Sequence, residues 1–175
     1  LVALAVLVVG LVNAGYVSRN LRTYGTPFDP RHSRDFPNQM LDWRGLVSTT
    51  LRTAVFQLQT PWDSLNLQLM RLVVGVHFKM GLDVNDPRST AIGEFNVGKP
   101  TTHEDTTTNP LHALLIFVTA VVSFFTVKRT GRRVLYYQLL VLIAFVAFSF
   151  MLKWQIFESR LFLPFFLIAA PAFGA

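Results

Sequence analysis

The chain has 175 residues, of which 51% are hydrophobic and only 15% are charged, whereas soluble domains carry charge at about a quarter of their positions. The formal net charge of +6 suits contact with anionic headgroups or phosphates. No basic stripe interleaved with aromatic residues is present, which argues against a nucleic-acid partner. The absence of cysteine excludes a disulfide framework and thiolate metal sites.

Hydrophobic runs open and close the chain, at residues 1–17 and 161–175. Neither run has a flanking charge on its outer side, and the first lacks the basic start and small-residue cleavage site of a signal peptide. We therefore expect two truncated transmembrane helices, cut from a larger polytopic protein. A complete four-span protein is the alternative interpretation.

Two further runs, residues 110–127 and 134–152, are each long enough to cross a bilayer when their polar edges reach the headgroups. The six residues 128–133, "KRTGRR", join them and carry four basic side chains with no acid. The positive-inside rule places such a short loop in the cytoplasm. Residues 18–109 and 153–160 are then expected on the outer side.

The long outer segment begins with an irregular loop and continues with a predicted helix near residues 38–59. Its apolar residues recur every three or four positions and its polar residues lie on the other side, which indicates an amphipathic helix. We expect the apolar stripe to pack on its own domain and the polar side to face water; a helix lying along the bilayer surface is the alternative. The stripe contains Met40, Trp43, Val47, Leu51, Ala54, Val55 and Leu58, and the polar side contains Asp42, Thr49, Arg52 and Thr53.

A second helix is predicted near residues 61–80. Thr60 suits the N-cap, Pro61 suits the first helical position, and Gly81 suits the C-terminal end. Apolar residues occupy much of two sides, so we expect burial on both. His77 is expected to be a packed or hydrogen-bonded histidine.

The triplet His103, Glu104 and Asp105 precedes the span at residues 110–127 and should lie near the outer headgroup plane. One histidine and two acids could bind a divalent metal, or serve as acid and base. A solvated loop is the alternative, and no cofactor is assigned with certainty.

The turn "KWQIFESR" provides the other candidates, Lys153 and Arg160, at the ends of two spans. They could clamp a phosphate or act as snorkelling anchors, with Trp154 and Phe157 as interfacial aromatics. The spans 110–127 and 134–152 should pack as an antiparallel hairpin. That hairpin would bring this turn and the triplet at 103–105 to one membrane surface, within one substrate-binding site.

Three stretches resemble the multispan glycosyltransferases of the GT-C superfamily, in particular bacterial relatives of dolichyl-phosphate-mannose protein mannosyltransferases. They are "NPLH" preceded by "HED", the turn "MLKWQIFESRLFLPFF", and "GYVSRNLRTYGTPFDP". The resemblance implies sugar transfer from a polyprenyl-phosphate-linked donor, on the outer face of a bacterial cytoplasmic membrane. In that family the acidic catalytic base follows the first span. This chain resembles a later part, so we expect the base to be absent and do not assign it to Asp29 or Asp35.

The resulting prediction is an all-α integral membrane fold with about four transmembrane helices and an extracytoplasmic insertion containing two amphipathic helices. The expected partners are membrane lipid and the lipid-linked donor. A non-enzymatic transporter or scaffold, or an O-antigen ligase or polymerase, remains an alternative. Transporters tend to carry polar groups within the membrane. We interpret the two complete spans as having no charge in their middles and only small hydroxyls, such as those of Thr119, Ser123 and Ser149, which disfavours transport.

Overall fold

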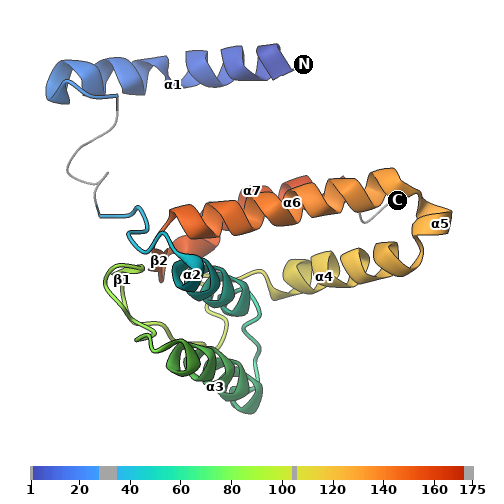
Figure 1. The fold of residues 1–175 in the computed structure, drawn as a ribbon. Coiled ribbons are helices and arrows are strands. Elements are labelled where there is room, and N and C mark those ends of the chain that lie inside the picture. The colour runs from blue at the N-terminus through green and yellow to red at the C-terminus, as the bar shows by residue number, and fades with distance from the viewer. Residues whose placement is uncertain (1, 28–34, 104–105, 172–175) are drawn as a thin grey trace. The chain divides into compact units, whose positions relative to one another are not determined.

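The computed structural model describes residues 2–27, 35–103 and 106–171. The protein is mostly helical, with 66% of its residues in helices and few in strands, as the all-α prediction requires. It divides into two compact units, Leu1–Pro37 and Asn38–Ala175, which are treated separately below (Figure 1).

The first unit consists mainly of α1 (Val2–Tyr24). The helix continues beyond the expected apolar run because no glycine or proline interrupts the chain between Tyr16 and Gly25. It stops at Gly25, which has a φ of 70°. The Asn20 side-chain amide then donates a hydrogen bond to the Pro27 carbonyl at 3.1 Å, which holds the turn that follows.

The second unit begins with two helices, α2 (Trp43–Phe56) and α3 (Asp63–Met80). Asp42 is the N-cap of α2, and its carboxylate accepts a hydrogen bond from the Gly45 N–H at 2.8 Å. The N-cap of α3 is Trp62, two residues after the expected Thr60. The helix ends at Gly81 in the left-handed conformation, as the sequence predicts.

The rest of the unit is a helical hairpin followed by a short helical segment. Residues Pro110–Phe125 form α4 and Arg132–Met151 form α6. The short helix α5 (Val127–Thr130) joins them, as Figure 1 shows. Beyond α6 lie the 3-10 helix η1 (Glu158–Phe162) and α7 (Leu163–Ala169).

The lengths of the apolar helices in the second unit test the prediction of four membrane spans. Among the described residues, α6 alone is long and apolar enough to cross a membrane by length and composition. Helix α4 is apolar but shorter, with 16 residues, and α7 has seven. The structure therefore supports a mostly helical fold without confirming four spans.

Two short strands lie near the end of α6 that is remote from α5. Strand β1 (Thr90–Ile92) pairs in parallel with β2 (Trp154–Gln155), which joins the segment after α3 to the segment after α6. The fully buried Trp154 ring lies at the centre of the core, with edge-to-face contacts to Phe56 and Phe95 at centroid distances of 5.6 and 5.2 Å. The core cluster comprises Val55, Phe56, Val73, Phe95, Val97 and Trp154.

The predicted polar side of α2 is buried instead of facing water, although part of the apolar stripe is also covered, since Met40 is buried and Leu51 packs against the core. The hydroxyl-bearing residues around Arg52 are buried, whereas Trp43, in the apolar stripe, is 61% exposed. The prediction was wrong because it assumed that polar side chains face water, while these find partners inside the protein. Val55 is the member of the stripe within α2 that is buried. The buried polar residues are Ser48, Thr49, Arg52 and Thr53.

Burial of α3 on two sides is also incorrect. The residues of α3 that are buried are Asn66, Val73 and His77, which share one face. Phe78, on another side, is 81% exposed. The helix therefore packs through a single face.

Candidate functional site

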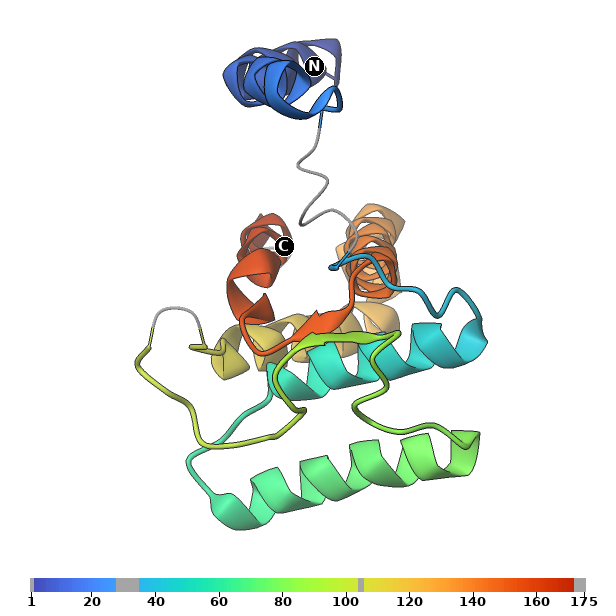
Figure 2. The same ribbon diagram turned by 90° about the vertical axis from the view of Figure 1, so that its left-hand side faces the viewer.

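The buried face of α2 organises a group of polar side chains in the second unit. We call this group the buried polar cluster. Its members come from α2, α3, the segment leading into β1, and η1 (Figure 2). They are Ser48, Arg52, Thr53, His77, Ser89 and Glu158, and each is nearly inaccessible to solvent.

The guanidinium of Arg52 is the centre of the cluster. Its Nε donates to the Ser48 carbonyl at 3.3 Å, and its Nη1 donates to the Val84 carbonyl and Thr90 Oγ1, both at 2.7 Å. Its Nη2 donates to the carbonyl and the hydroxyl of Ser89 at 2.8 and 2.9 Å. All five N–H groups of the side chain thus have acceptors.

Burial lowers the pKa of Arg52 to about 10, against the attraction of the Glu158 and Asp86 carboxyls. The guanidinium still carries its charge at neutral pH. Its central carbon also lies 5.8 Å from the centroid of the Trp154 ring, which adds a cation–π contact. The Ser89 carbonyl that accepts from Arg52 also accepts a hydrogen bond from the backbone N–H of Trp154 at 2.9 Å. Arg52 is therefore coupled directly to the segment that follows α6.

His77 is the member of the buried polar cluster that comes from α3. Its Nδ1 lies 2.8 Å from the Val73 carbonyl, which can only accept, so Nδ1 carries the proton. Burial lowers the pKa of His77, which keeps the ring neutral at pH 7. Nε2 then accepts from the Ser48 hydroxyl at 2.9 Å. His77 is a packed, hydrogen-bonded histidine, as the sequence predicts.

Glu158 supplies the acidic member. Burial raises the pKa of its carboxyl to about 8, opposed by the Thr53 hydroxyl and the charge of Arg52. Thr53 Oγ1 donates to Oε2 at 3.3 Å. The Trp154 indole N–H is near enough to lower the pKa slightly, yet its geometry does not make a hydrogen bond. A largely protonated carboxyl thus lies close to the Arg52 guanidinium.

The cluster contains residue types used in catalysis, but its members are closed off from solvent. A general base must reach the proton that it abstracts in a bound substrate. The arrangement instead joins segments that are far apart in sequence, as the bond between Thr53 and Glu158 across 105 positions shows. The cluster therefore joins α2 to α3, to the segment that follows α3 and to η1.

The sequence-predicted site residues fall into three groups. Arg160, in η1, is exposed, as is His103 in the loop before α4. Lys153 is only 9% exposed, so its side chain is much less accessible to a surface ligand than that of Arg160. Glu104 and Asp105 lie outside the described residues. Trp154 was expected to be an interfacial anchor, but it is a core residue because its indole fills the space between Phe56 and Phe95.

The residues before α4 and the residues after α6 lie at the same end of the hairpin that these two helices form. Gln59 and Gln57 hold the residues before α4: the Thr108 hydroxyl donates to Gln59 Oε1 and the Asn109 N–H donates to Gln57 Oε1, both at 3.2 Å. At the start of α4, the His112 ring lies 5.9 Å from that of Phe166 in α7. The loop with His103 and the segment with Arg160 therefore approach one end of the second unit.

The proposed metal site receives no support from the described part of the chain. No group of three or more metal-binding side chains is present there, and two of the three expected ligands, Glu104 and Asp105, are not among the described residues.

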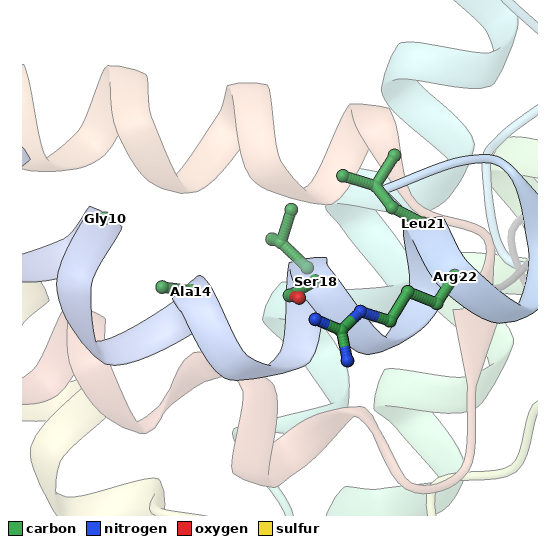
Figure 3. A pocket seen from close by; sticks show the side chains of 6 residues that line it. Gly10, Ala14, Ser18, Leu21 and Arg22 are labelled. Carbon is green, nitrogen blue, oxygen red and sulfur yellow. The ribbon is translucent and has the colours of Figure 1, made fainter.

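An open hollow also runs along one side of α1 (Figure 3). One helix forms its only wall. The small residues Gly10, Ala14 and Ser18, spaced four apart, leave a shallow surface there. It therefore lacks the enclosure that small-molecule sites require. It is lined by Gly10, Ala14, Val17, Ser18, Leu21 and Arg22.

The sequence analysis missed the buried polar cluster. The available signal was a lone arginine surrounded by small hydroxyl residues at helical spacing, with Ser48, Thr49 and Thr53 beside Arg52 and no acid among them. Solvated helix faces more often pair arginine with acidic residues one turn away.

Comparisons with protein-family models, with curated proteins and with solved structures found no match.

Proposed function

We propose that this chain is part of a bacterial membrane glycosyltransferase that transfers a sugar from a polyprenyl-phosphate-linked donor at the outer membrane face. In this proposal α1, α4, α6 and α7 belong to four spans, and α2 and α3 belong to the outer insertion. The sequence resemblance to the GT-C superfamily motivates the reaction class.

The membrane assignment is supported by α6. Only 11% of its most apolar 18-residue window is buried, whereas the core helix of a soluble protein is mostly covered. Basic residues gather at the α5 end of the hairpin, at Lys128, Arg129, Arg132 and Arg133. This charge supports a cytoplasmic position for that end.

The observation that carries the proposal is the setting of Arg160. Arg160 is an exposed residue, yet its neighbours Glu158 and Ser159 are buried, so the backbone beside it is anchored. A positioned guanidinium at the outer end of a span suits recognition of a lipid-linked phosphate.

Replacing Arg160 in the intact protein tests this proposal. Loss of a charge-assisted contact costs about 1.5–3 kcal/mol, or roughly tenfold to a hundredfold in affinity. Arg160→Ala should weaken use of the lipid-linked donor by that factor, and Arg160→Lys should restore only part of it. Arg71→Ala, which removes an exposed arginine on α3, is the control. Unchanged donor dependence in Arg160→Ala would contradict the proposal.

The orientation is tested separately. In intact cells, a cysteine at Gly131 should be shielded from an impermeant thiol reagent, and one at Thr107 should be labelled. The reverse pattern would place the candidate residues in the cytoplasm.

A second candidate function, transport or helix association, is favoured by one residue that the sequence analysis overlooked. Gln138 lies within α6, and both polar atoms of its amide are shielded from solvent without a hydrogen-bond partner among the described residues. Thr119 and Ser149, by contrast, donate to carbonyls of their own helices. A polar group inside a span often marks a functional site or a helix contact.

Gln138→Leu separates the two functions. A glycosyltransferase that acts at the outer surface should keep its transfer rate in this variant, because the change is distant along α6 from Met151. Loss of substrate movement across the membrane in reconstituted vesicles would favour the transporter.

A further inference from the structure

Helix α2 buries its polar side more deeply than the side that carries Trp43, Val47 and Ala54, although its Val55 and Phe56 side chains are also in the core. Its polar face is buried, and Arg52 alone makes five hydrogen bonds there. Its apolar side is uncovered at Trp43 and half-buried at Val47 and Ala54. In water, an arrangement that buries a charge and exposes a tryptophan loses hydrophobic stabilisation. In a hydrocarbon environment the same arrangement is favourable.

Helix α2 is also fixed to the end of the proposed span. The Asn38 N–H donates to the Met151 carbonyl at 2.9 Å, and the Asn38 side-chain amide donates to the Phe150 carbonyl at 2.9 Å. Figure 1 shows α2 nearly end-on with α4 and α6 side-on, and Figure 2 shows the reverse, so α2 runs across the axes of the hairpin. If α6 crosses a bilayer, α2 lies roughly in the membrane plane, near its surface.

The side chains at the start of α2 are of the types found at the membrane surface. Leu41 and Trp43 are exposed, and so is Met151 at the end of α6, at 66%. The uncovered apolar surface of α2 is therefore adjacent in the fold to that of the span. The Arg44 guanidinium lies 5.6 Å from the centroid of the Trp43 ring. An arginine beside a tryptophan places a cation near lipid phosphates and an amphipathic ring at the headgroup level.

We propose that α2 lies in the membrane interface with its Trp43, Val47 and Ala54 side against the lipid acyl chains and Arg44 among the headgroups. Lipid is the occupant because this surface adjoins the uncovered surface of α6 and carries a cation at its edge. The inference rests on the membrane assignment made under the proposed function, but not on the transfer reaction.

Spin labelling tests this placement directly. The chain contains no cysteine, so single labels can be introduced at Trp43→Cys and Val47→Cys in the intact protein, reconstituted in nanodiscs of phosphatidylcholine and phosphatidylglycerol. Oxygen partitions into lipid and a neutral nickel chelate stays in water. We expect both labels to collide at least several-fold more with oxygen, relative to nickel, than a label at Glu94→Cys in the exposed segment after β1.

A label at Leu140→Cys, which replaces an exposed residue of α6, provides the matched lipid reference. If Leu140 has the oxygen preference and both α2 labels collide mainly with nickel, only the placement of α2 is overturned. If both α2 labels are shielded from both reagents, protein covers this side and the placement is again overturned. A nickel preference at Leu140 would overturn the membrane assignment itself. Because two α2 positions are labelled, disruption of the fold by one label leaves the test intact.

Discussion

The layer built on α2 and α3 and the hairpin of α4 and α6 satisfy their buried polar side chains differently. In the layer of α2 and α3, the buried Arg52 guanidinium binds groups 32 to 38 positions away. In α6, the buried Ser149 hydroxyl donates to the Phe145 carbonyl of its own helix. Phe145 and Phe148 then pack with Phe162 of η1 at centroid distances of 5.1 and 5.3 Å.

This difference indicates that the two regions depend on different forces. The layer of α2 and α3 combines the apolar core around Trp154 with directional hydrogen bonds around one buried charge, so a few residues should dominate its stability. The hairpin is held by many small aromatic and aliphatic contacts, whose individual contributions are modest. The four predictions below test that contrast, in order of decreasing expected effect.

Arg52→Ala should have the largest effect. It removes five hydrogen bonds and leaves the Val84 and Ser89 carbonyls without their charged donor. We expect a loss of about 3–5 kcal/mol in the free energy of unfolding, measured as a lower melting temperature in detergent. Arg52→Lys should recover part of the loss, and Arg44→Ala, an exposed control, should change little. Equal melting temperatures for Arg52→Ala and Arg44→Ala would contradict the central role of Arg52.

Gly45→Ala should be the next most damaging change. A Cβ at this position would meet the Met40 carbonyl oxygen at 1.8 Å, so the backbone before α2 would have to move. We expect a loss of about 1–3 kcal/mol, measured by thermal unfolding. Gly75→Ala in α3 is the matched control, because nothing lies within 4 Å of its added Cβ. That change should stabilise the protein by about 0.5–1 kcal/mol. A stabilising Gly45→Ala would show that the two segments do not approach closely.

Between pH 7 and 8.5, where only the last part of its titration falls, Glu158 should produce a pH dependence of intermediate size. Its pKa is raised from 4.5 to about 8 in the folded protein, so the folded state holds the proton more tightly than the unfolded state does. The resulting stability is fully present below pH 4.5 and is lost as pH rises through about 8, by roughly 1.4 kcal/mol per pH unit in between.

Melting temperatures of the wild type and Glu158→Gln between pH 7 and 8.5 measure this effect. The wild type should lose stability over this interval and Glu158→Gln should not. His77 does not interfere, because its pKa is lowered from 6.5 and it affects stability only at more acidic pH, with the opposite sign. Parallel curves for the two proteins would show that Glu158 ionises normally.

Asp42→Ala should have the smallest effect. The Asp42 carboxylate accepts a hydrogen bond from the Gly45 N–H at the start of α2, and loss of such a cap costs about 1 kcal/mol. Asn109 occupies the same position in α4 but makes no side-chain cap hydrogen bond. Asn109→Ala should therefore change the melting temperature less. A larger effect at Asn109 would reverse the contrast between the two regions.

Several local features were predictable from the sequence. The helix end at Gly81 and the start of α4 at Asn109 and Pro110 occur where the residue types place them. They were predictable because capping and proline geometry depend on a few adjacent residues. The start of α3 was missed by two residues, since the Thr60 hydroxyl accepts from the Trp62 N–H instead of capping the helix itself.

The positions of the candidate site residues were less predictable. Arg160 and His103 are exposed, as surface ligands must be, but Lys153 is not. The difference arises because β2 begins at Trp154 and draws the residues beside it into the core. A strand of two residues has no sequence signal of its own, because it exists only through pairing with β1.

By itself, the sequence determined that this protein is mostly helical, that α3 ends at Gly81 and that α4 begins at Asn109 and Pro110. It predicted four spans, of which α6 alone is long and apolar enough to cross a membrane among the described residues. These properties follow from composition and from interactions between residues a few positions apart. Only the tertiary structure decided which face of α2 is buried. The periodicity of α2 shows two faces, but a polar face can face inward when distant groups satisfy it. The acceptors of Arg52 lie at Val84, Ser89 and Thr90, and the acceptor of Thr53 lies at Glu158.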